Sequence, residues 1–294
     1  MIYVYREGRS TSANSLAEEL EAVRIRQLGN LRARLVRGDA VICWGMHLPA
    51  IEGVKVLNGE APLRAKFTDV GILRDAGVPT IEAHRTKPAP PAAPTDPAIE
   101  ALAIFAESAD SVRYAPAGGL IPRTTAMLTA LANHITAANT LRNVLSRPAP
   151  AAPPAAEWLP RVSDHADGND LLAPPAEPDF WVKKENITRE YRVHSFLGKS
   201  IAAGPKVPNP EYPEQHPWIR TTDGGWKIAY TGVEPRHREI AAAAVKALGL
   251  DFGAVDIGER PDGSLIVLEV NRAPSLEPIA RRNYAAAVER WLSR

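Results

Sequence analysis

Two carboxylates and one amide near the carboxyl end of the chain, Asp256, Glu269 and Asn271, have a spacing that could build a single chemical site. The two apolar runs that carry them flank Asp262-Gly263, and Asp-Gly between alternating hydrophobic residues is a strong β-hairpin signal. With a two-residue loop at this dipeptide, Asp256 lies opposite Glu269. Because side chains alternate between the faces of a strand, all three polar groups then share one face.

This face would place two negative charges directly opposite each other, which destabilises a sheet unless something compensates. A proton shared by the two carboxylates would compensate, and so would a cation. Mg²⁺ is usually held by one or two carboxylates with substrate phosphates completing its octahedron, and the amide oxygen of Asn271 would add a hard ligand. A hairpin face whose charges simply point into water is the remaining alternative.

The sequence around this hairpin resembles the metal-binding end of the ATP-grasp superfamily. Residues 250–256 supply an acid on one strand, and residues 268–274, LEVNRAP, supply a Glu-x-Asn motif and a proline-containing loop. D-alanine–D-alanine ligase and the glutamate ligases that extend ribosomal protein tails belong to this superfamily. The resemblance implies that Asp256, Glu269 and Asn271 are Mg²⁺ ligands.

Two cations earlier in the chain resemble family residues that meet the nucleotide phosphates. Lys66 opens the segment KFTDVGILRDAGVP, where the family has a lysine at the start of a helix. Arg161 and Gly168 lie in a segment that resembles the strand and loop that cover ATP, although the family has lysine and several glycines there. A solvated lysine at a helix end and an exposed polar turn are the alternatives.

The run 189–196 alternates and predicts a strand with Glu190, Arg192 and His194 on one face. By resemblance, Glu190 is the acid that faces the ribose, and Arg192 is an arginine that meets the transferring phosphate or the acyl phosphate. We expect His194 to be a structural histidine whose hydrogen bonds are satisfied. Lys206, on the next strand, resembles a cation near the phosphates.

The residues before this strand, Lys183, Lys184 and Glu185, resemble the hinge that holds adenine through backbone groups. Ala254 stands where some peptide ligases of the family have an arginine, which argues against a D-alanine–D-alanine ligase proper.

The elements that must position these residues are predicted from apolar periodicity and turn residues. Residues 1–86 alternate strand and helix signals, which indicates a small parallel α/β sheet. A capping box at Ser15 and Glu18 predicts the start of the first helix. The expected strands are 2–5, 40–44, 54–58, 78–81, 179–185, 189–196, 200–206 and 226–230, and the expected helices are 67–76, 238–248 and 279–292.

Proline–alanine runs at 87–97 and 148–154 predict semi-rigid spacers. Between them, residues 98–109 and 124–145 have helical periodicity, so we expect a helical insertion that serves as a lid or a partner surface. The predicted domains are an N-terminal α/β domain at 1–86, the insertion at 87–156 and an ATP-grasp region at 157–294.

Composition narrows the class of protein. The net charge is +1, so no long-range attraction to nucleic acid is expected. A single cysteine, Cys43, excludes an internal disulfide framework and fits a reducing cytosol. No apolar run approaches the roughly 20 residues that a membrane helix needs. We therefore expect a cytoplasmic protein, in the host cytoplasm if the chain is one of the short phage-encoded ATP-grasp proteins that it resembles.

The resemblance implies an α/β protein with the ATP-grasp fold, in which a parallel N-terminal domain precedes two lobes that grip ATP. It implies an ADP-forming ligase that uses ATP and Mg²⁺ to activate a carboxylate as an acyl phosphate, which an amine then attacks. The substrates would be small molecules or peptides. A phosphotransferase on the same fold and a non-catalytic nucleotide-binding or scaffold protein are the alternatives, and homo-oligomerisation stays open.

Overall fold

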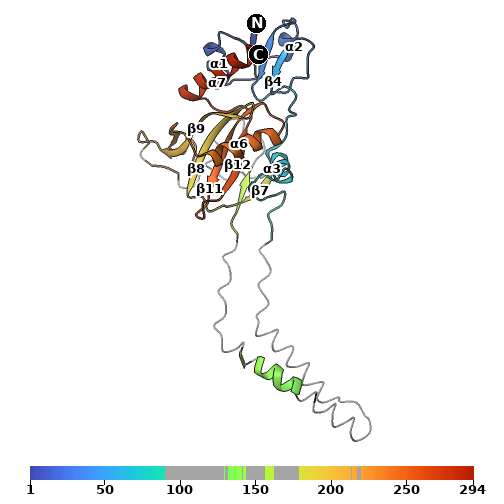
Figure 1. Ribbon diagram of the computed structural model, residues 1–294, viewed down its shortest axis with the longest axis vertical. Coiled ribbons are helices and arrows are strands. Elements are labelled where there is room, and N and C mark those ends of the chain that lie inside the picture. The colour runs from blue at the N-terminus through green and yellow to red at the C-terminus, as the bar shows by residue number, and fades with distance from the viewer. Residues whose placement is uncertain are drawn as a thin grey trace, which may run out of the picture. The chain divides into compact units, whose positions relative to one another are not determined.

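The computed structural model describes residues 1–89, 129, 132–140, 142–143, 156–161, 179–212, 214–216 and 220–294. Met1–Pro88 and Glu157–Arg294 together form one compact unit, and Ala89–Ala156 form a second (Figure 1). Residues 132–140 are helical and fall within the predicted helix 124–145. The predicted helix 98–109 lies outside the described residues.

A four-stranded parallel sheet with the order β2-β1-β3-β4 forms the N-terminal part, as the alternation of strand and helix signals predicted. Strand β3 is buried at all four positions, which agrees with its continuous apolar sequence. The strands are β1 (Ile2–Tyr5), β2 (Val23–Ile25), β3 (Ala40–Cys43) and β4 (Lys55–Leu57), and the helices beside them are α1 (Thr11–Glu19) and α2 (Leu28–Arg32).

The predicted capping box at Ser15 and Glu18 is wrong. Ser10 is the N-cap of α1, and its side-chain oxygen accepts a hydrogen bond from the backbone N–H of Ala13 at 3.2 Å. Ser15 lies inside the helix and donates its hydroxyl to the carbonyl of Thr11 at 3.0 Å. The helix starts earlier because Ala13, three residues before Leu16, is buried in the same cluster, so the apolar face of the helix extends over the turn before Ser15.

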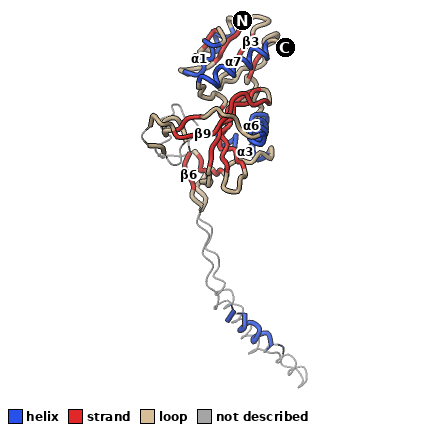
Figure 2. The backbone as a smooth tube through the Cα atoms, turned by 60° about the vertical axis from the view of Figure 1, so that its left-hand side comes forward, coloured by secondary structure: helices blue, strands red, loops and turns tan. Residues whose placement is uncertain are grey.

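A five-stranded antiparallel sheet with the order β10-β9-β8-β11-β12 forms the centre of the same unit (Figure 2). Leu197 and Gly198, at φ 46° and 76°, join β8 to β9, as a two-residue hairpin with positive φ at both positions requires. The strands are β8 (Arg189–Phe196), β9 (Lys199–Pro208), β10 (Trp226–Ile228), β11 (Phe252–Glu259) and β12 (Leu265–Asn271).

Helix α6 (Pro235–Ala247) covers one face of this sheet (Figure 1). Ala241, Ala244 and Val245 of the helix pack with Val193 and Val255 of the strands in one buried cluster. Because side chains alternate along a strand, the neighbours of these valines point to the opposite face. That opposite face carries the polar residues described below.

Helix α7 (Pro278–Leu292) and the N-terminal sheet share a second core with the central sheet. The ring of Trp44 stacks on Phe252 with centroids 5.2 Å apart, and Tyr284 meets Trp44 edge-on at 5.5 Å. The side chain of Asn58 donates to the carbonyl of Phe252 at 2.9 Å and accepts from the N–H of Asp251 at 2.7 Å. The N-terminal sheet is therefore fixed to the start of β11.

A three-stranded sheet with the order β5-β7-β6 completes the described strands. It consists of β5 (Ala83–His84), β6 (Trp158–Arg161) and β7 (Phe180–Lys183), and α3 (Lys66–Asp75) packs near β5. The predicted strand 78–81 forms only an isolated bridge, in which Thr80 pairs with Val267 of β12. Among the described helices, none is both long and apolar enough to span a bilayer.

Candidate active site

A row of charged side chains crosses the central sheet on the face away from α6. The register places Arg192 of β8 opposite Asp256 of β11, and Asp256 opposite Glu269 of β12. Ala254 pairs with Asn271 two residues away along the same strands. The predicted face-to-face placement of the two acids is confirmed.

The loop that sets this register is not the predicted two-residue turn. Arg260 and Ser264 close the hairpin, since the N–H of Arg260 donates to the carbonyl of Ser264 at 2.9 Å. The loop is therefore 261–263, with Gly263 at φ 79°, as expected for a three-residue hairpin loop. A bulge after Asp256 shifts the register by one and offsets the longer loop. The extra loop residue and the bulge shift the pairing by one residue in opposite directions, so the two acids still face each other.

Asp256 is held by two cations. Arg192 donates from Nε to Oδ1 and from Nη2 to Oδ2, both at 2.8 Å. Lys206 lies 3.4 Å from Oδ2 and also pairs with Glu190. Burial would raise the pKa of Asp256, but the charges of Arg192 and Lys206 outweigh it and hold that pKa well below its usual range. Asp256 is thus a carboxylate at any physiological pH.

Lys66 is the first residue of helix α3, as predicted, and its side chain extends to the row of charged residues. Its Nζ lies 2.7 Å from Oε1 of Glu269, and it donates to the carbonyl of Val270 at 3.0 Å and to Oδ1 of Asn271 at 3.4 Å. Desolvation raises the pKa of Glu269, but the interactions with Lys66 and Arg192 together lower it by more, so Glu269 is also ionised.

The site therefore balances three acids against three cations, which are Glu190, Asp256 and Glu269 with Lys66, Arg192 and Lys206. The part of the chain that the structure describes holds no group of three or more His, Cys, Asp and Glu side chains that could bind a metal. Two carboxylates and an amide oxygen are nevertheless hard ligands of the type that Mg²⁺ takes. Each of the three already meets a cation, since Arg192 donates to both oxygens of Asp256 and Lys66 lies against Glu269 and Asn271, so a bound ion would share these oxygens with them.

The residues of the predicted adenine hinge find their partners in the three-stranded sheet. The backbone N–H of Lys183 donates to the carbonyl of Glu82 at 2.9 Å, and that of Lys184 donates to Glu157 at 2.8 Å. The side chains of both lysines also pair with these two glutamates. The structure does not bring them into the acid row.

Two more of the predicted residues, Glu185 and Arg161, also lie apart from the row. Glu185 forms an ion pair with Arg260, whose Nη2 is 2.9 Å from its carboxylate. Arg161 ends β6, where it pairs with Phe180 of β7. Gly168 lies outside the described residues.

The prediction that the hydrogen bonds of His194 are satisfied is wrong. His194 is fully buried, and neither ring nitrogen has a hydrogen-bond partner among the described residues. Burial and the charge of Arg192 lower its pKa to about 3. The rings of Tyr230 and Tyr284 lie 6.2 and 5.6 Å away, and their buried hydroxyls lack partners in the same described part of the chain.

Gly204 is a site residue that sequence reasoning missed. It pairs with Arg192 across β8 and β9. A Cβ at this position would lie 1.8 Å from the carbonyl oxygen of Ala229, so only glycine allows this close approach. A glycine inside a strand pattern was the available signal.

Comparison with known proteins identifies the family. Residues 107–291 match the model of a protein family whose description is an ATP-grasp domain, family 3 of one clade of these domains. Over 73 residues the chain is 36% identical to a probable alpha-L-glutamate ligase of Citrobacter koseri. That alignment covers 24% of each protein, so the chain matches about a quarter of the length of this curated relative.

Two solved structures share the fold. The ATP-grasp ligase PsnB, complexed with a minimal precursor, Mg and ADP, has a TM-score of 0.53 at 13% identity, over 100% of this chain and 98% of PsnB. D-alanine–D-alanine ligase from Bacillus anthracis has a TM-score of 0.53 at 14% identity, over 98% and 92%. The fold is the ATP-grasp fold, as predicted. Because the family match spans more than half of the sequence, the chain belongs to this family of ATP-grasp domain proteins.

Proposed function

We propose that this chain is an ATP-dependent ligase that joins a carboxylate to an amine through an acyl phosphate, releasing ADP and phosphate. The observation that carries the proposal is the row from Arg192 through Asp256 to Glu269, with Lys66 at its end. In a chain of the ATP-grasp family, this row would supply the charged groups that stabilise a transferring phosphoryl group. The partial match to a probable glutamate ligase and the ligases among the structural neighbours support the same reaction type.

Each residue of the row has a proposed task. Glu269, Asn271 and Asp256 would hold Mg²⁺, which when bound neutralises phosphate charge. Asp256 also orients Arg192, whose Nη1 is not used by that pair and is left for an oxygen of the transferring phosphoryl group. Lys66 would bind phosphate oxygens beside Glu269.

The other predicted nucleotide contacts remain part of the proposal. Lys206 would add a further cation near the phosphates, and Glu190 would face the ribose. Backbone groups of Lys183, Lys184 and Glu185 would meet adenine, apart from the two N–H groups that donate to Glu82 and Glu157. Arg161 and Gly168 would belong to the covering loop.

The chemistry needs no nucleophile from the protein. A carboxylate oxygen attacks the terminal phosphorus of ATP and ADP leaves. The amine then attacks the carbonyl carbon and phosphate leaves. The protein must hold the reacting groups in line and keep water from the acyl phosphate. We also propose a cytoplasmic location, because Cys43 is a buried free thiol.

The test measures ADP release by the full chain with candidate acids, with and without amines. ADP release that requires both an acid and an amine, together with amide formation, supports the ligase. A stable phosphorylated product formed without an amine would instead indicate a phosphotransferase. Failure of the full chain to bind Mg-ATP in calorimetry would reject both enzymes and leave the scaffold alternative.

A further inference from the structure

Three arginines gather at the carboxyl edge of the N-terminal parallel sheet. Arg6 directly follows β1, Arg24 lies within β2, and Arg26 directly follows β2. The backbone N–H of Arg6 donates to the carbonyl of Ile25 at 3.1 Å, which holds the two strand ends together. In open α/β sheets, ligands bind outside the carboxyl ends of the strands.

The guanidinium groups of Arg6 and Arg24 lack acidic partners in the described parts of the chain. Among the described residues, Arg6 Nη1 donates only to the carbonyl of Gly45 at 3.5 Å and the sulfur of Met46 at 3.9 Å. Arg24 donates to the carbonyls of Ile25 and Gly8. The Nε atoms of both arginines are buried and have no hydrogen-bond partner there. Unpartnered buried donors of this kind are costly, and an anion would satisfy them.

The electrostatic environment of Arg24 agrees with this view. Burial and the charges of Arg26 and Arg6 lower its pKa, and no acid among the described residues opposes them. Like charges this close repel unless an anion lies between them. The cluster is therefore complementary to a negatively charged group.

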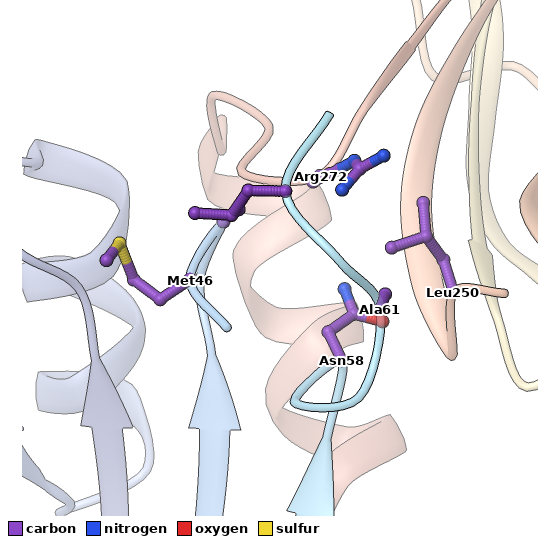
Figure 3. Close-up of a pocket in the computed structure, with 7 residues that line it drawn as sticks. Met46, Asn58, Ala61, Leu250 and Arg272 are labelled. Carbon is purple, nitrogen blue, oxygen red and sulfur yellow. The ribbon is translucent and has the colours of Figure 1, made fainter. Parts of the chain in front are cut away.

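Arg6 borders the loop that follows the acid row. Gly45 has a φ of 72°, and a Cβ there would lie 2.8 Å from both Arg6 Nη1 and the Cβ of Ala273. Ala273 follows Asn271 by two residues, so the guanidinium of Arg6 is next to the segment that carries the proposed metal ligands. Met46 and Arg272, labelled in Figure 3, line a small hollow beside the same glycine.

We propose that Arg6 and Arg24 bind a carboxylate of the substrate that is not the one activated. Planar guanidinium groups match a carboxylate with two parallel hydrogen bonds, and Arg6 lies beside Gly45 and Ala273 rather than in the row, which separates this group from the reacting one. The carboxylate would be the second acid of an acidic amino acid or the C-terminus of a peptide. This inference rests on the proposed ligase function.

The test is calorimetry on the full chain with paired probes. L-glutamate is compared with L-glutamine, and trialanine with its C-terminal amide, so that each pair differs in one carboxylate. One acid probe is expected to bind about tenfold or more tightly than its amide. The pair that shows this difference tells whether the bound carboxylate is that of an acidic amino acid or that of a peptide C-terminus. Arg6→Gln and Arg24→Gln should each remove that preference. Arg34→Gln, at an exposed arginine of the same sheet domain, should keep it.

Three outcomes overturn the inference. The first is equal affinity for acid and amide in both pairs, and the second is an unchanged preference in Arg6→Gln. Tighter binding of inorganic phosphate than of either acid would assign the cluster to phosphate and also overturn it. If Arg6→Gln does not fold, Arg6→Lys keeps the charge but not the two parallel bonds, and it should lose most of the preference.

A separate titration with Mg-ATP distinguishes this inference from the proposed function. Normal Mg-ATP binding without carboxylate preference defeats the inference alone. Carboxylate preference that depends on Arg6, in a chain that does not bind Mg-ATP, defeats the ligase and leaves the arginine site in place.

Discussion

Arg192 and Asp256 face each other on neighbouring antiparallel strands and are joined by two hydrogen bonds of 2.8 Å. Their side chains are 17% and 7% exposed, so the pair lies largely out of water. The two-point contact fixes the plane of the guanidinium group, which a single bond would leave free to rotate. The pair thereby sets both the charge and the geometry of the centre of the row.

Removal of one member of this pair should destabilise the protein strongly. Asp256→Ala leaves Arg192 as a buried charge without its partner and removes one of the two acids beside Lys206, and the expected loss in free energy of unfolding is about 3–5 kcal/mol. Urea denaturation measures it. Glu234→Ala, which breaks an exposed 2.8 Å pair with Arg236, is the matched control and should cost less than about 1 kcal/mol. Equal losses of free energy of unfolding in the two variants would show that the buried pair contributes no more to stability than an exposed ion pair.

Glu269→Ala should abolish turnover while leaving the fold intact. The side chain is 39% exposed, so its loss should change stability by no more than about 1 kcal/mol. The rate of ADP release should fall at least about 100-fold, since a group that organises transition-state charge is lost. Glu289→Ala, on the exposed surface of α7, is the control and should keep full activity. Undiminished turnover in Glu269→Ala would reject this residue as a metal ligand.

Gly204→Ala should disrupt the site through the backbone. The new Cβ would collide with the carbonyl of Ala229, and the strand that carries Lys206 must shift to relieve the contact. We expect a loss of at least about 2 kcal/mol in thermal unfolding, in the range of strong overpacking. Gly71→Ala in α3, where nothing lies within 4 Å, should stabilise the protein by about 0.5–1 kcal/mol. If Gly204→Ala matched wild-type stability, the close approach of Ala229 would be refuted.

Protonation of His194 should make stability depend on pH. Its pKa is about 3 in the folded protein and about 6.5 in the unfolded chain, so only the unfolded chain binds the proton between these values. Stability is therefore full above about pH 6.5 and falls as the pH drops, by about 2 kcal/mol at pH 5. His194→Phe should remove this part of the loss in urea denaturation at pH 7.5 and 5. His47→Phe, at an exposed position, should retain it, and parallel curves for all three proteins would exclude His194 as the source.

Local signals were enough for much of the fold. Strand β8 occupies the predicted residues 189–196, because alternation over eight residues leaves little choice of face or length. Helices α3 and α6 end before Gly77 and Gly249, whose φ values of 73° and 68° suit the end of a helix. Such features depend on neighbouring residues, which the sequence displays directly.

Features that depend on distant contacts were mispredicted. Ser10 rather than Ser15 caps α1, because the turn that carries Ala13 is buried in the core together with Leu16. The hairpin loop is one residue longer than Asp262-Gly263 alone, and a bulge after Asp256 restores the pairing. Bulge positions reflect strain and pairing across the whole sheet, which a dipeptide signal does not contain.

The sequence by itself determined the chemistry of the row: which residues are acids or amides, that Asp256, Glu269 and Asn271 share a face, and which family the motif resembles. Only the tertiary structure decided which cation meets which acid. Lys66 reaches Asn271 across 205 positions and Arg192 reaches Asp256 across 64, while Arg6 and Arg24 meet no acid in the described residues. The reason is physical: periodicity sets the direction of a side chain within its own element, whereas charge pairing depends on packing between elements.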